Sequence, residues 1–143
     1  ADSESIGKVL REFLDFCGDN IIIGHCVEID MAFLGREIKR LTGKKFRNKS
    51  VDTLAVYRWL CGRYYHRDSV AAKNPTLYDI AAEFAIPAEI GHHAMMDAYI
   101  TAQLFQRFIP ALQCCGVHQI GDLLRIGDLS RGGLSAPGEF SNF

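Results

Sequence analysis

The chain has 143 residues, of which 48% are hydrophobic and 23% charged, and its formal net charge is −1. This length and composition are typical of one ordinary folded domain and exclude a disordered tail. The charge excludes the basic surface that drives salt-dependent binding to duplex DNA, so any nucleic acid must be held locally. The sequence contains no apolar run of about twenty residues and does not begin like a secretion signal, which predicts a protein without a membrane partner.

The first half of the chain predicts a helix, a strand and a second helix. Apolar residues recur at helical spacing after Ser5, which is suited to capping, and Gly18 ends the pattern. The run Ile21-Ile22-Ile23 follows a turn signal and predicts a strand buried on both faces, as in parallel sheets. The second helical pattern runs from Asp30 to Gly43.

The middle of the chain predicts another strand and two helices. Residues 46–51 are expected to form a short strand, and Asp52 or Thr53 then caps a helix that continues to Leu60. Thr76 is the expected cap of a helix that ends before Pro87.

The last third of the chain predicts the longest helix, over residues 94–113, which Pro110 should bend or end. A short amphipathic stretch over residues 120–126 comes before a turn-rich tail that we expect to be loose. Strands followed by helices indicate an α/β architecture in which helix outweighs strand.

The cysteines indicate a reducing compartment. Their number is odd, and they lie in or beside apolar stretches, where a free thiol behaves as a small hydrophobic group. No paired Cys-x-x-Cys is present, which argues against a zinc site. We therefore predict reduced thiols and a cytoplasmic protein. The five cysteines are Cys17, Cys26, Cys61, Cys114 and Cys115.

A histidine and two aspartates stand out as candidates for chemistry. Asp30 follows the first predicted strand, and Asp97 lies early in the long helix, five residues after His92. On a helix that spacing would turn His92 about 140° from Asp97, so His92 belongs on the preceding loop. A carboxylate that holds a hard cation and an imidazole that takes a proton from water suit metal-assisted hydrolysis. Plain capping and dipole roles fit the same spacing, so the pattern alone leaves both interpretations open.

Three segments resemble the motifs of the DEDDh-type 3′→5′ exonuclease superfamily. The family's second motif, typically Gly-His-Asn-x-x-Phe-Asp-x-x-Phe-Leu, is similar to Gly24-His25-Cys26-Val27-Glu28-Ile29-Asp30-Met31-Ala32-Phe33-Leu34. The Asp-Thr-Leu step that follows is similar to Val51-Asp52-Thr53-Leu54. The third motif, His-Arg-Ala-x-x-Asp-Ala-x-x-Thr, is similar to His92-His93-Ala94-Met95-Met96-Asp97-Ala98 with Thr101 beyond. The resemblance covers about residues 5–108 and is strongest to the epsilon-type proofreading subunits of bacterial DNA polymerase III.

The resemblance implies a ribonuclease-H-like fold and release of nucleoside 5′-monophosphates from 3′ ends. It implies that Asp97 ligates a metal directly, that Asp30 belongs to the metal site by fixing a metal-bound water or a residue next to the ligands, and that His92 is the general base. The implied cofactors are two Mg²⁺ or Mn²⁺ ions. The implied partners are a single-stranded 3′ end of DNA or RNA and a DNA polymerase. The candidate substrate contacts are His25, Phe33 and His93, of which His93 stands in place of the usual Arg.

The family's first motif, Asp-x-Glu-Thr at the end of an apolar strand, has no clear counterpart. Asp2-Ser3-Glu4 reads Asp-x-Glu, but no apolar run comes before it, and we interpret it as coincidence. We therefore expect an α/β fold truncated at its amino terminus, in which helix dominates and only short parallel strands remain. We also expect an incomplete metal site that leaves this chain alone almost inactive. Residues 1–116 are predicted to be the carboxy-terminal part of the exonuclease domain, and residues 117–143 a short helix and a loose Gly/Ser/Pro-rich tail.

Two alternatives and one further partner remain open. The first alternative is a catalytically silent nucleic-acid-binding or regulatory module of the same fold. The second is an RNA-trimming relative, because the motifs do not separate DNA from RNA. The strand at Ile21-Ile22-Ile23 is expected to lack a neighbour, and an unpaired strand edge invites self-association with a second chain.

Overall fold

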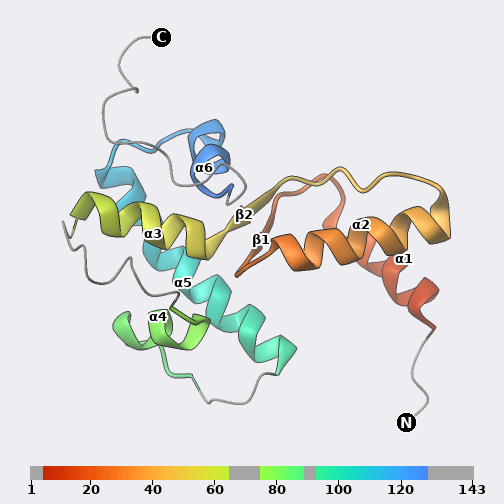
Figure 1. The fold of residues 1–143 in the computed structure, drawn as a ribbon, viewed down its shortest axis with the longest axis horizontal. Coiled ribbons are helices and arrows are strands. Elements are labelled where there is room, and N and C mark those ends of the chain that lie inside the picture. The colour runs from red at the N-terminus through yellow and green to blue at the C-terminus, as the bar shows by residue number, and fades with distance from the viewer. Residues whose placement is uncertain (1–4, 65–74, 89–92, 129–143) are drawn as a thin grey trace.

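The structure, a computed structural model, describes residues 5–64, 75–88 and 93–128 of the chain. It contains helices and two strands that follow one another as Figure 1 shows. Their order and bounds are α1 (Ile6–Cys17), β1 (Ile22–Gly24), α2 (Glu28–Thr42), β2 (Ser50–Asp52), α3 (Thr53–Tyr64), α4 (Leu77–Glu83), α5 (Ala94–Cys114) and α6 (Ile120–Ile126).

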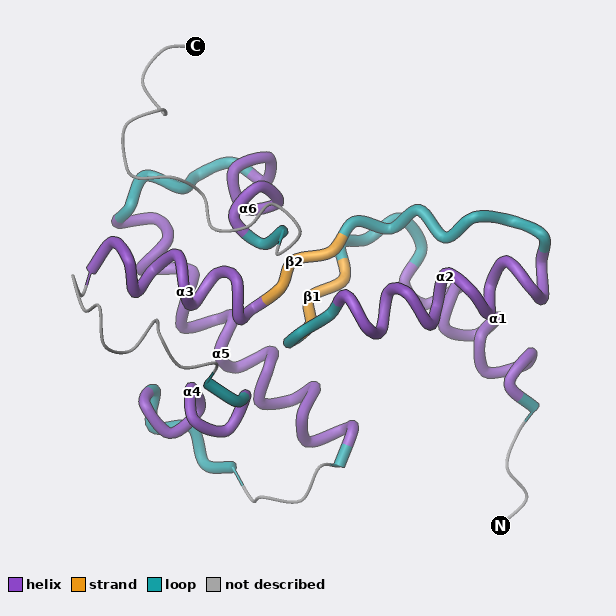
Figure 2. Tube along the Cα trace, in the orientation of Figure 1, coloured by secondary structure: helices purple, strands orange, loops and turns teal. Residues whose placement is uncertain are grey.

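A short parallel sheet connects two groups of helices. β1 pairs with β2 in a register that sets Ile22 opposite Ser50 and Gly24 opposite Asp52. Figure 2 shows the sheet in the middle of the molecule, with α1 and α2 on one side and α3 to α6 on the other. The prediction of an α/β fold dominated by helix, with short parallel strands, is confirmed. Within the described ranges, none of the helices is long and apolar enough to cross a membrane.

The hydrophobic core lies among α3, α4, α5 and α6. One face of α5 places Ile100, Leu104 and Phe108 in the core, each without solvent exposure. This spacing of four residues keeps side chains on one side of a helix. The Phe108 ring lies 5.3 Å from the Phe84 ring, and Ile126 brings α6 into the same cluster. Each fully buried side chain of this size contributes about 1.5–3 kcal/mol.

Local capping explains where several helices begin and end. Thr76 and Asp79 form a reciprocal capping box at the start of α4, and these hydrogen bonds lower the pKa of Asp79. Gly43 ends α2 in the left-handed conformation, with φ of 69°. Ser5 occupies the cap position of α1, but its side chain makes no capping hydrogen bond. Of the two candidate caps for α3, Asp52 accepts a hydrogen bond from the Leu54 amide at 2.8 Å.

The two strands differ from the sequence-based expectation. The side chain of Ile23 is 38% exposed, so the prediction that β1 is buried on both faces was wrong. In the described part of the chain β1 has a strand neighbour on one side only, and an open cavity borders it. β2 begins at Ser50 rather than at residue 46.

α5 continues past Pro110 to Cys114, so the alternative in which this proline ends the helix was wrong. Proline removes the amide that would bond to the carbonyl of the residue four positions before it, here Gln106. Both Gln106 and Pro110 are exposed, so water can satisfy that carbonyl without interrupting the helix.

The end of α4 supplies a stability test. Ala85 has a positive φ of 50°, a conformation that costs a non-glycine residue about 1–2 kcal/mol. We expect Ala85→Gly to raise the free energy of unfolding by about 1 kcal/mol in urea denaturation. Ala82→Gly, at an exposed position inside α4, is the matched control and should lower it by about 1 kcal/mol. Equal losses in both variants would contradict the strain at Ala85.

Candidate active site

A cavity of about 810 Å³ lies beside β1 and is walled by α2, the start of α4 and the first half of α5. Four of the residues selected from the sequence line it, although they come from two different helices, α2 and α5, and from the loop after β1. They are His25, Asp30, Phe33 and Asp97.

Asp30 and Asp97 reach this cavity from equivalent places in their helices. Asp30 lies in the first turn of α2 and Asp97 in the first turn of α5, where the helix dipole stabilises a carboxylate. Asp30 is exposed, whereas Asp97 is half-buried. The tertiary fold therefore brings together two carboxylates that are 67 residues apart in the chain.

Tyr78 is a site residue that the sequence analysis missed. It lies near the start of α4, and its phenol donates a hydrogen bond to Asp97 Oδ1 at 2.5 Å. This bond fixes the orientation of the carboxylate and leaves Oδ2 for another partner. Because the two residues are 19 positions apart, no local pattern in the sequence signals the contact.

The hydrogen bonds of His25 define its tautomer. The Thr53 hydroxyl lies 3.2 Å from the Gly24 carbonyl oxygen and 3.0 Å from His25 Nδ1. A hydroxyl has one proton, which it donates to the carbonyl, so Nδ1–H of His25 donates to the Thr53 oxygen. The other ring nitrogen, Nε2, is then the acceptor of the neutral imidazole. Burial lowers the pKa of His25, an effect that Asp52 opposes and Arg58 reinforces.

Stability should depend on pH through His25. Because folding lowers the pKa of His25 below its usual 6.5, the unfolded chain takes up the proton first. We expect the free energy of unfolding to fall as the pH drops below about 6.5, and this dependence to be shallower in His25→Gln. Urea denaturation between pH 7.5 and 5.5 measures it, with His118→Gln, at an exposed position, as the control for replacing a histidine by glutamine. The same slope in His25→Gln and the unmodified chain would contradict the assignment.

Cys26 adopts a backbone conformation that suits asparagine better than cysteine. Its φ is 54°, and Asn is several-fold enriched among non-glycine residues in this region. The typical family motif has Asn at this place, and this backbone conformation favours Asn over Cys. Burial and the nearby Asp52 raise the pKa of the Cys26 thiol, which keeps it protonated.

We expect Cys26→Asn to raise the free energy of unfolding by about 0.5 kcal/mol, because Asn tolerates the left-handed conformation. Thermal denaturation provides the measurement. The matched control is Cys114→Asn at the exposed carboxy-terminal end of α5, where the same replacement should slightly lower stability. A greater loss at Cys26 than at Cys114 would contradict the prediction.

Two histidines selected from the sequence are not among the described residues that line the cavity. His93 precedes α5 and is exposed, and it does not line the cavity. His92 lies outside the described residues. Among the residues that the structure describes, no group of three or more His, Cys, Asp or Glu side chains could hold a metal ion. A second pocket of about 660 Å³, on the side of β2 and α6, contains neither Asp30 nor Asp97.

Comparison with known families shows which family the chain belongs to. The sequence model of the exonuclease family matches residues 1–105. The chain therefore belongs to the exonuclease family.

Its relatives include proteins named as forms or subunits of DNA polymerase III. DNA polymerase III subunit epsilon of Aquifex aeolicus is 36% identical over 128 residues, which are 90% of this chain and 58% of that protein. The PolC-type DNA polymerase III of Thermotoga maritima is 32% identical over 89% of this chain and 9% of its own length. A DNA polymerase III subunit epsilon-like protein of Rhodobacter capsulatus is 30% identical over 87% of this chain and 17% of its own. The predicted resemblance to the epsilon type is confirmed, and the chain spans less than two thirds of each of these relatives.

Proposed function

We propose that the protein containing this chain is a metal-dependent 3′→5′ exonuclease that hydrolyses the terminal phosphodiester of DNA to nucleoside 5′-monophosphates. The observation that carries this proposal is the cavity that gathers Asp30, Asp97, His25 and Phe33. Membership of the exonuclease family supports the reaction class. The names of the relatives support DNA as the substrate and a DNA polymerase as a partner.

Asp30 and Asp97 are the residues that would hold divalent cations. Carboxylate oxygens are the ligands that Mg²⁺ and Mn²⁺ prefer, so the donor type of these two side chains suits such ions, although the two carboxylates alone do not complete a site. Each of these hard cations takes about six oxygens, so water, substrate phosphate and residues outside the described ranges must supply the others. When bound, such ions neutralise charge on the attacking and leaving oxygens.

The side chains of this chain position the substrate and move a proton. His92 is proposed to accept the proton of the attacking water on a ring nitrogen. Phe33, 45% exposed on the cavity wall, offers an aromatic face for the terminal base. Nε2 of His25 offers an acceptor to a sugar hydroxyl, and His93 is proposed to contact the strand outside the cavity. The cavity volume of about 810 Å³ suits a terminal nucleotide with part of its neighbour.

The test uses the full-length protein and oligonucleotides of single-stranded DNA or RNA, labelled at either end, with Mg²⁺, Mn²⁺ or a chelator. We expect a 5′ label to give a ladder that shortens from the 3′ end, and a 3′ label to appear first as a mononucleotide. DNA should be preferred over RNA. A preference for RNA would identify an RNA-trimming relative. Binding without metal-dependent hydrolysis would contradict the proposal and identify a silent module.

We also propose a reducing, cytoplasmic location and self-association through β1. All five cysteines are free, and Cys17 and Cys61 are buried as small hydrophobic groups. Within the described residues, the edge of β1 away from β2 has no strand partner, and such edges pair readily with another chain. Light scattering on this chain should show an oligomer, and the Ile23→Lys variant should be a monomer. A monomer at all concentrations would contradict self-association.

A further inference from the structure

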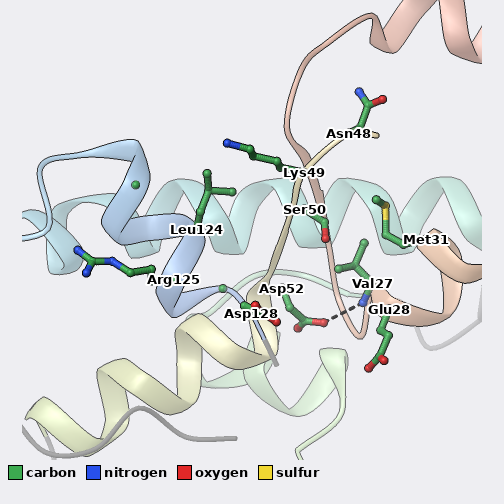
Figure 3. A pocket seen from close by; sticks show the side chains of 12 residues that line it. Val27, Glu28, Met31, Asn48, Lys49, Ser50, Asp52, Leu124, Arg125 and Asp128 are labelled. Atoms are coloured by element: carbon green, nitrogen blue, oxygen red, sulfur yellow. Dashed lines mark hydrogen bonds between the residues drawn. The ribbon is translucent and has the colours of Figure 1, made fainter. Parts of the chain in front are cut away.

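Asp52 is a buried carboxylate that the proposed reaction does not use. Its residue is 1% exposed, and both oxygens accept backbone hydrogen bonds. Oδ1 accepts from the Leu54 amide and Oδ2 from the Val27 amide, each at 2.8 Å. Figure 3 shows Asp52 reaching from β2 toward the backbone nitrogen of Val27, with a dashed line marking the bond.

These two hydrogen bonds join the start of α2, which carries Asp30, to the start of α3. Val27 is the cap residue of α2, and its carbonyl accepts the Met31 amide at 2.9 Å, so its position sets the first turn of α2 and with it Asp30. Leu54 lies in the first turn of α3, which packs against α5, the helix that carries Asp97. Asp52 therefore lies on a short path between Asp30 and Asp97.

Close packing restricts the conformation of the turn between β1 and α2, and with it the position of Val27. A Cβ at Gly24 would lie 2.5 Å from Val27 Cγ2, so the backbone of Gly24 is packed directly against the Val27 side chain. The Thr53 hydroxyl holds the Gly24 carbonyl at 3.2 Å, next to the bond made by Asp52. Asp52 and Thr53 thus hold the two ends of the turn by hydrogen bonds, Thr53 to the Gly24 carbonyl and Asp52 to the Val27 amide.

We propose that Asp52 is a positioning residue, whose carboxylate places Asp30 relative to Asp97 by holding the Val27 amide. This role rests on the proposed function of those two aspartates. The chemistry requires an ionised carboxylate because only that group accepts at both oxygens. An asparagine at the same place has one acceptor, and its NH₂ group would face a backbone N–H.

The test compares Asp52→Asn with the unmodified full-length protein. Asn is a good helix cap, so it should keep the Leu54 bond and lose the Val27 bond. We expect Asp52→Asn to accelerate hydrogen exchange of the Val27 amide at least about tenfold, while the exchange rate of the Leu54 amide stays close to that of the unmodified protein. Calorimetric titration with Mn²⁺ should show affinity reduced roughly 10–100-fold, the usual effect of losing a group that orients a metal ligand.

A matched control separates positioning from loss of stability. Leu60, 5% exposed, lies in the second half of α3 and does not itself line the cavity, so Leu60→Ala destabilises the core without removing a cavity side chain. Below the melting temperature of both variants, we expect Leu60→Ala to keep the Mn²⁺ affinity of the unmodified protein. An equal loss of affinity in Leu60→Ala, or unchanged affinity in Asp52→Asn, would overturn the positioning role. Failure of the unmodified protein to bind Mn²⁺ would instead contradict the proposed function, and with it the role of Asp52.

A second pair of variants applies if Asp52→Asn does not fold. Thr53→Val removes the hydroxyl bonds to the Gly24 carbonyl and to His25 Nδ1 without changing the shape of the side chain, and Thr53→Ser restores both. We expect reduced Mn²⁺ affinity in Thr53→Val and recovery in Thr53→Ser. The same Mn²⁺ affinity in both variants would contradict the role of these hydrogen bonds in positioning the turn.

Discussion

Asp97→Asn should reduce exonuclease turnover of the full-length protein by roughly 10³-fold, which corresponds to about 4 kcal/mol of lost transition-state stabilisation. Asparagine has the same shape, and its oxygen still accepts the hydrogen bond from Tyr78, so the change removes the charge and leaves the packing. Steady-state hydrolysis of single-stranded DNA measures turnover. Thermal denaturation should show a melting temperature close to that of the unmodified protein.

Asp122→Asn is the matched control for this substitution. Asp122 pairs with Arg125 on α6, and it lines neither wall of the Asp30 and Asp97 cavity. We expect its turnover to equal that of the unmodified protein. Near-normal turnover in Asp97→Asn, or a comparable loss in Asp122→Asn, would contradict the role assigned to Asp97.

Gly127→Ala should be the most destabilising of the small substitutions considered, by about 2–3 kcal/mol in urea denaturation. A Cβ at Gly127 would lie 2.7 Å from Val51 Cγ1 and 3.0 Å from the Val51 Cα atom, which is backbone and cannot move alone. The Gly127 carbonyl also accepts the Asp52 amide at 2.9 Å. The extra methyl group would therefore push the end of α6 away from β2.

Gly121→Ala in α6 is the control, because a Cβ there meets nothing within 4 Å. Alanine should raise stability at this helical position by up to about 1 kcal/mol. The pair also tests the predicted boundary at residue 116. If Gly127→Ala leaves the unfolding of the core unchanged, α6 is independent of the domain before it. A large loss would show that α6 belongs to the same cooperative unit.

The sequence predicts elements well where local chemistry decides them. The Thr76 and Asp79 box marks the start of α4, and Gly43 marks the end of α2, because each acts on hydrogen bonds within a few residues. The amphipathic stretch over residues 120–126 matches α6 to the residue. Among the site residues, the two motifs with Asp30 and Asp97 led to side chains that line one cavity.

Features that depend on distant parts of the chain could not be predicted. The exposure of Ile23 depends on how many neighbours the sheet has, and a β-branched run looks the same with or without them. Pro110 is tolerated because it lies with Gln106 on the exposed side of α5, and that exposure depends on the tertiary fold. The bond between Tyr78 and Asp97 and the strained φ of Cys26 likewise leave no spacing or composition signal.

Paramagnetic broadening by Mn²⁺ tests directly whether Asp30 and Asp97 form a cation site. In NMR spectra of the full-length protein, substoichiometric Mn²⁺ should first broaden the amide signals of the first turns of α2 and α5, around Asp30 and Asp97. Asp97→Asn should abolish this broadening, whereas Asp122→Asn should leave it unchanged. Broadening centred on the second pocket, near Asp128, or the same broadening in Asp97→Asn, would contradict a cation site formed by Asp30 and Asp97.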